Sequence, residues 1–73
     1  MTEEQIVKQF ADLMLKKIEL RHNRYAPLGW KTMDKKRIMT LLKGELQEYE
    51  EDLKPDELID VANYCMFLYN ISI

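Results

Sequence analysis

Cysteine and histidine are almost absent from this sequence, and their scarcity excludes whole classes of small protein. Of 73 residues, Cys65 is the one cysteine, so no disulfide can form within the chain. His22 is the one histidine, so a zinc site built from cysteine and histidine is excluded as well. A chain without disulfides suits a reducing compartment, and the sequence therefore predicts a cytoplasmic protein.

Glycine, proline and long apolar runs are scarce too. Two glycines and two prolines leave few breaks in regular structure, and the alternation typical of strands does not occur. The longest apolar run, Tyr64 to Tyr69, is far too short to span a bilayer, and the N-terminus lacks the features of a signal peptide. We therefore expect one all-α domain over residues 1–73, with no membrane partner.

The net charge is −2, and acidic and basic residues are mixed along much of the chain. This balance argues against a nucleic-acid partner, which would favour a basic face. The one local basic cluster is Lys35, Lys36 and Arg37. Because nothing else in the sequence supports nucleic-acid binding, we rank it third among the candidate functions.

Hydrophobic spacing and capping residues predict three helices. Thr2 and Gln5 have the form of a capping box, and the first helix should run from about residue 3 to the low twenties. Asp34 is a suitable N-cap for the second helix, and Pro55 suits the first turn of the third.

Two acidic pairs flank the break between the second and third helices. Each has the form Glu-x-x-acid: Glu45 and Glu48 precede the break, and Glu57 and Asp60 follow it. If the helices run antiparallel across a turn centred on residues 52 and 53, Glu45 comes level with Asp60, and Glu48 with Glu57. Glu45 also falls among the apolar positions of its helix. Four carboxylates at one level are costly without cations, and the sequence offers no cation well placed to offset them. The pattern predicts a divalent-metal site.

Carboxylate oxygens are hard ligands, which suit Mg²⁺, or alternatively Mn²⁺, better than zinc. A metal held by these four side chains would neutralise a triphosphate and present an activated water to a phosphoryl group. Basic side chains that could hold the outer phosphates are Lys31, Lys35, Lys36 and Arg37, although a solvated surface is their simpler interpretation.

The connection before the second helix, residues 23–33, is long and contains both Pro27 and Gly29. Trp30 supplies a flat apolar surface there. It can serve either as a core residue or as a platform on which a ligand stacks, and the sequence leaves both open.

The chain resembles the MazG-like, all-α nucleoside triphosphate pyrophosphohydrolases, a superfamily that includes dimeric dUTPases and phosphoribosyl-ATP pyrophosphatase. Its signature is a Glu-x-x-Glu on one helix and a Glu-x-x-Asp opening the next, similar to Glu45-Leu-Gln-Glu48 and Glu57-Leu-Ile-Asp60. The resemblance covers about residues 14–71. Many members have a glutamate where this chain has Gly44.

The resemblance implies Mg²⁺-dependent cleavage of a nucleoside triphosphate to the monophosphate and pyrophosphate, in a homodimer or homotetramer that completes the site across subunits. It implies that both acidic pairs bind metal and that Glu45 or Glu48 orients the attacking water, with the inward placement of Glu45 in its favour. It also implies substrate contacts from these residues: His22, Asn23, Trp30, Asn63 and Tyr64. Lys31, one of the basic candidates for the outer phosphates, is a further predicted substrate contact.

The third helix is apolar on nearly every side, which predicts that it must be covered on more than one side. Self-association through this helix is the direct inference. The same feature supports the alternative function, a non-catalytic helical interaction module that binds a partner through the third helix.

Overall fold

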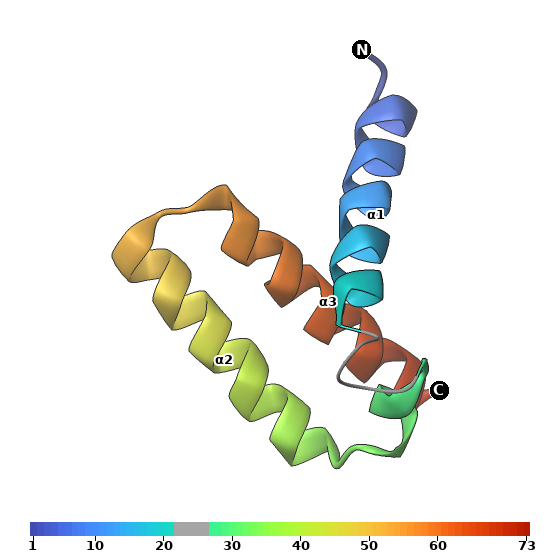
Figure 1. Ribbon diagram of the computed structural model, residues 1–73, viewed down its shortest axis with the longest axis vertical. Helices are drawn as coiled ribbons and strands as arrows, with labels where there is room; N and C mark the ends of the chain where they lie inside the picture. Colours follow the sequence, from blue (N-terminus) through green and yellow to red (C-terminus); the bar gives the residue numbers. More distant parts are fainter. Residues whose placement is uncertain (22–26) are drawn as a thin grey trace.

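A computed structural model describes residues 1–21 and 27–73 of the chain. Within these residues the structure consists of α1 (Glu3–Leu20), the short 3₁₀ helix η1 (Gly29–Thr32), α2 (Lys35–Asp52) and α3 (Pro55–Ser72), with no strand (Figure 1). The prediction of an all-α chain with three α-helices is confirmed for the described part. No helix in that part is long and apolar enough to cross a membrane.

The two predicted helix starts have the expected caps. The Thr2 hydroxyl accepts from the Gln5 backbone N–H at 3.2 Å, and the Gln5 side chain accepts from the Thr2 N–H at 2.8 Å. Asp34 caps α2 by accepting from the Lys36 N–H at 3.1 Å. Each cap satisfies backbone donors that have no partner within the helix, and so fixes where the helix begins.

A tight turn joins α2 to α3 and makes them antiparallel (Figure 1). Leu53 ends α2 in the left-handed region, with φ of 55°, and its N–H donates to the Tyr49 carbonyl at 2.7 Å. That backbone conformation costs a non-glycine residue about 1 kcal/mol. Pro55 then begins α3, where its missing N–H and fixed φ are tolerated. The turn fixes which residues of α2 and α3 face each other.

The third helix is the centre of the fold, because α1, α2 and η1 all pack against it. The core consists of Ile38 from α2 with Tyr64 and Phe67 from α3, and Ile18 of α1 and Trp30 of η1 pack against this cluster. The chain itself therefore covers α3 on two sides. From the sequence, the apolar composition of α3 predicted self-association. Because the chain itself covers α3 on two sides, that composition alone does not require a second chain.

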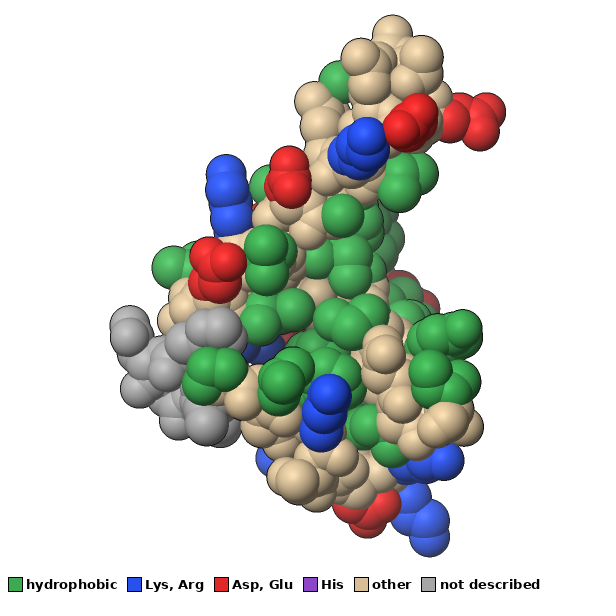
Figure 2. Space-filling view, turned by 90° about the vertical axis from the view of Figure 1, so that its right-hand side faces the viewer, with side chains coloured by type: hydrophobic (Ala, Val, Ile, Leu, Met, Phe, Trp, Pro, Cys, Tyr) green, Lys and Arg blue, Asp and Glu red, His purple; other side chains and the backbone are tan. Residues whose placement is uncertain are grey.

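The first half of α1 stands clear of the α2–α3 hairpin (Figure 1), and residues 1–13 are all exposed. Among them, Ile6, Phe10 and Leu13 keep 52%, 39% and 44% of their surface in contact with solvent. Figure 2 shows hydrophobic side chains along this projecting limb and on the adjoining body of the molecule. Within the described residues, more of the exposed large hydrophobic side chains thus lie on α1 than on α3.

Ile38 is the one described side chain with no solvent exposure, so its truncation tests the core directly. We expect Ile38→Ala to lower the free energy of unfolding by about 2–5 kcal/mol, because it removes buried methyl groups and leaves a cavity. Thermal or urea unfolding followed by circular dichroism measures this. The neighbouring Met39 is 46% exposed, and Met39→Ala should cost well under half as much; equal losses would contradict this core.

Candidate functional site

The antiparallel hairpin brings the two acidic pairs to facing stretches of α2 and α3. Burial raises the pKa of Glu45, and the negative charges of Asp60 and Glu48 raise it further, while Arg21 acts in the opposite direction. The charge of Asp60 therefore acts on Glu45 across the hairpin and raises its pKa. This agrees with the pairing obtained by counting residues outward from the turn.

Glu57 is the second carboxyl with a raised pKa. The causes are removal of its carboxylate from solvent, then contact with Asp52, and then the charge of Glu48. Its Oε2 atom is covered and has no hydrogen-bond partner among the described residues. An unpaired covered acceptor is unfavourable, and a cation would satisfy it.

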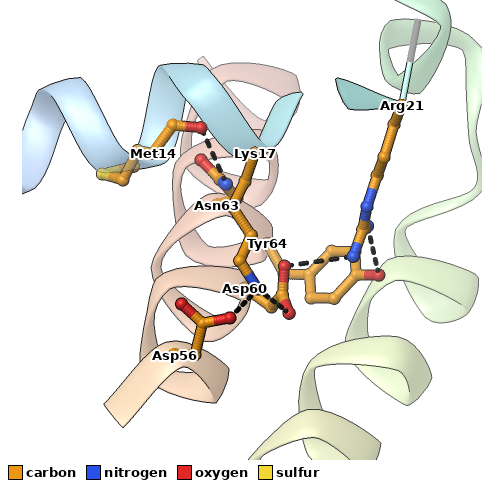
Figure 3. A network of polar contacts seen from close by, with 7 residues as sticks. All are labelled: Met14, Lys17, Arg21, Asp56, Asp60, Asn63 and Tyr64. Atoms are coloured by element: carbon orange, nitrogen blue, oxygen red, sulfur yellow. Dashed lines mark hydrogen bonds and ion pairs between the residues drawn. The ribbon is translucent and has the colours of Figure 1, made fainter. Parts of the chain in front are cut away.

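Asp60, by contrast, is already neutralised. Its side chain is only 10% exposed, and α1 supplies two cations to it (Figure 3). The Lys17 ammonium donates to Oδ2 at 3.1 Å, and the Arg21 guanidinium donates to Oδ1 at 3.0 Å. The sequence-based expectation that no cation is well placed to offset the acidic residues is therefore wrong. A charge this far from water requires such partners.

Each of the two cations also holds a second partner. Lys17 forms an ion pair with Asp56 at 3.0 Å, and Arg21 donates to the Tyr64 hydroxyl at 3.2 Å (Figure 3). Burial lowers the pKa of Lys17, but its hydrogen bonds to Asp56 and Asp60 outweigh this and leave the pKa above its ordinary value. Lys17 is therefore charged at neutral pH.

Asn63 and Tyr64, predicted as substrate contacts, lie at the junction of α1 and α3. The Asn63 amide donates to the Met14 carbonyl at 3.2 Å, and the residue is 5% exposed. Its Oδ1 atom is covered and has no partner within residues 1–21 and 27–73. Tyr64 is 8% exposed and packs edge-on against Phe67. Both side chains join α1 to α3, whatever else they bind.

Trp30 is half-buried and stacks on Phe67, with ring centroids 4.6 Å apart and planes 12° from parallel. One face of the indole thus belongs to the core. This favours a role for Trp30 as a core residue over a role as a platform on which a ligand stacks. Lys31, on the same short helix, is exposed, and its ammonium lies 6.0 Å from the Trp30 ring centre. The predicted contacts from His22 and Asn23 lie outside the described residues.

The four predicted ligands suit a divalent cation in chemistry and in charge, and the unpaired Glu57 oxygen is a suitable donor. They are not gathered around one point. In the part of the chain that the structure describes, no group of three or more Asp, Glu, His or Cys side chains is placed to hold a metal ion. Glu48 is exposed, whereas Asp60 is held by the ion pairs to Lys17 and Arg21.

Gly44, where the resemblance would place a further glutamate, is exposed on α2. A Cβ atom at this position would meet nothing within 4 Å. Packing therefore does not require glycine here, and a longer side chain would fit.

Lys17 and Arg21 are the polar residues that sequence reasoning missed. They lie 43 and 39 residues from Asp60, so no local rule connects them to it. The available signal was their spacing, one helical turn apart and next to the inward-facing residues Met14 and Ile18 on α1.

Comparison of the chain with known protein families, with curated proteins and with solved structures found no match.

The raised pKa values have a consequence for stability. Because the pKa of Glu45 in the folded chain lies above its ordinary value of 4.5, the folded state binds this proton more tightly than the unfolded state does. The contribution of Glu45 to stability therefore falls as pH rises from about 4.5 through the raised pKa, and remains unfavourable at neutral pH.

We expect Glu45→Gln to raise the melting temperature at pH 7.5, because the amide removes a charge that burial and the neighbouring carboxylates disfavour. The gain should disappear below pH 4.5. Thermal unfolding between pH 4 and 8, without divalent metal, measures it. Glu50→Gln changes the same charge at an exposed position of α2 and serves as the control. A lower melting temperature for Glu45→Gln at pH 7.5 would contradict the assignment.

Proposed function

We propose that this chain is a Mg²⁺-dependent nucleoside triphosphate pyrophosphohydrolase, which cleaves (d)NTPs to the monophosphate and pyrophosphate and removes non-standard nucleotides. The observation that supports it is the pairing of carboxylates across the α2–α3 hairpin. The charge of Asp60 raises the pKa of Glu45, and the charge of Glu48 raises the pKa of Glu57. This pairing leaves an excess of negative charge that a divalent cation would relieve.

In this proposal the acidic side chains have different roles, which depend on their burial and charge surroundings. Glu48 is exposed and can turn towards a metal and its ligand, while Glu45 is half-buried and has a raised pKa. A carboxylate whose pKa moves towards neutrality is a better general base, so Glu45 is the group that orients and deprotonates the attacking water. A bound Mg²⁺ would supply charge neutralisation for the phosphates. Lys31, exposed beside Trp30, is available to the outer phosphates.

We further propose that the active form is a cytoplasmic homodimer or homotetramer. The support comes from α1, whose exposed residues Ile6, Phe10 and Leu13 recur at helical spacing on the limb that projects from the hairpin. An exposed apolar helix face of this kind marks an interaction site, and in a twofold dimer the same face of a second copy can cover it. The interface predicted for α3 is thereby extended to the first half of α1.

A second candidate function has its own support. Asp60 is neutralised by Lys17 and Arg21 within the chain, as a structural ion pair would be. In a non-catalytic interaction module the acidic residues would only shape the hairpin, and the apolar surfaces of α1 and α3 would bind a partner. Binding of Mg²⁺ or Mn²⁺ separates the two functions, because only the enzyme needs it.

Glu48→Gln tests the catalytic proposal most cleanly, since Glu48 is exposed and its loss should leave the fold intact. Mg²⁺-dependent release of pyrophosphate, measured over a panel of standard and modified nucleoside triphosphates, should fall by at least about 100-fold. That is the upper end of the loss seen when a partner of a metal ligand is removed. Glu50→Gln, on the exposed side of the same helix, should keep full activity. Equal activity in the two variants would refute the assignment.

Light scattering at micromolar concentration tests the assembly. We expect the mass of two or four chains for the wild type and a smaller mass for Phe10→Glu, because a charge would then have to be buried in the interface. Lys8→Glu changes a residue of the same helix that is exposed and pairs with Glu4, and it should leave the mass unchanged. A monomeric wild type would contradict the proposed assembly.

A further inference from the structure

Asp60 stands apart from the other three predicted metal ligands because both of its oxygen atoms already accept from a cation. Lys17 donates to one at 3.1 Å and Arg21 to the other at 3.0 Å. Lys17 lies in the last turn of α1 and Arg21 is the C-cap residue that follows it, and both reach Asp60 on α3 (Figure 3). A divalent cation approaching Asp60 would meet two positive charges at close range, and opposite partners of this kind compete.

We propose that Lys17 and Arg21 are counter-ions that hold Asp60 until a divalent metal ion displaces them, so that metal binding at the hairpin is coupled to the attachment of α1. This inference rests on the proposed function, because it assumes that Asp60 is a metal ligand. It adds two residues of α1 to the site and gives them a defined role. They set how tightly the metal binds.

The second partners of the two cations make the exchange feasible. Lys17 keeps Asp56 at 3.0 Å when it leaves Asp60, and Arg21 keeps the hydroxyl of Tyr64 at 3.2 Å. Neither charge is then stranded without a partner, which is the main cost of breaking a partly buried ion pair. The Asn63 amide still donates to the Met14 carbonyl, so α1 keeps a polar tether to α3 while its ion pairs change.

The exchange predicts opposite effects on folding and on metal affinity. Removing a cation leaves Asp60 buried with fewer partners, which destabilises the metal-free chain. The same removal frees Asp60 for the metal and tightens binding. A purely structural ion pair would produce the first effect without the second.

Calorimetric titration with Mn²⁺ alone, at pH 7.5 and fixed ionic strength, tests the coupling. We expect Lys17→Met and Arg21→Met each to tighten Mn²⁺ binding by up to about fivefold, the upper limit set by the coupling energy of a partly exposed ion pair. Both substitutions should also lower the melting temperature without metal. Lys16→Met removes the same charge from an exposed position of α1 and controls for net charge. Lys17→Arg, which keeps the charge, should retain wild-type affinity.

A double-mutant cycle identifies Asp60 as the shared residue. In an Asp60→Asn background, Lys17→Met should no longer change Mn²⁺ affinity, because the carboxylate for which they compete has gone. Hydrogen exchange by the amides of residues 14–21 should increase when Mn²⁺ is added to the wild type, and should not change in Asp60→Asn.

The outcomes are distinct. Tighter binding in Lys17→Met and Arg21→Met than in Lys16→Met supports the inference, including the case in which only those two variants bind Mn²⁺ measurably. If the wild type binds Mn²⁺ and both variants bind it equally or more weakly, the inference is wrong while the proposed function stands. If no variant and no wild type binds Mn²⁺, the proposed metal site is itself refuted.

Discussion

The ion pairs between α1 and the buried Asp60 are the interaction on which the rest of this structure depends. The hairpin of α2 and α3 is defined by its own turn and core, but α1 reaches it over a limited area and leaves residues 1–13 exposed. Lys17 and Arg21 tie the end of α1 to α3, and their attachment sets the position of the whole first helix. A buried carboxylate without such partners destabilises the fold, because the free energy of its desolvation is not offset. The orientation of α1 therefore depends on this charge on α3, together with the packing of Ile18 and the hydrogen bond from Asn63 to the Met14 carbonyl.

Glu45 and Glu57 are compensated only in part, by the charges of Arg21 and Lys54 respectively. Burial and the neighbouring acidic charges raise the pKa values of Glu45 and Glu57, and the Glu57 Oε2 lacks a partner within the described residues. A helical hairpin held together by its core can carry this unfavourable charge, and proteins accept such a cost chiefly at functional sites. Asp60 is thus neutralised from within the chain, whereas Glu45 and Glu57 keep raised pKa values.

Local rules predicted the local structure well. The capping box at Thr2, the cap at Asp34 and the start of α3 at Pro55 all follow from residue chemistry within one turn. Counting outward from the turn also predicted that Glu45 lies by Asp60, because two antiparallel helices share one rise per residue. The ion pairs of Lys17 and Arg21 escaped prediction, since they join residues about 40 positions apart and depend on how α1 crosses α3. The sequence left the role of Trp30 open, and the structure assigns it to the core because its ring stacks on Phe67. The activity and the assembly remain predictions that rest on resemblance and on exposed apolar surface.

The central proposal is that both acidic pairs hold the same metal ion, for which their side chains would have to come closer together than they lie in this structure. Paramagnetic broadening by bound Mn²⁺ in a nuclear magnetic resonance spectrum of the labelled chain tests it most directly. One ion held between the helices should broaden the amide signals around Glu45 and Glu48 on α2 and around Glu57 and Asp60 on α3 at the same low Mn²⁺ concentration, while the signals of residues 3–10 stay sharp. Broadening confined to one helix, or spread evenly over the exposed acidic residues Glu50, Glu51 and Asp52, would contradict the account.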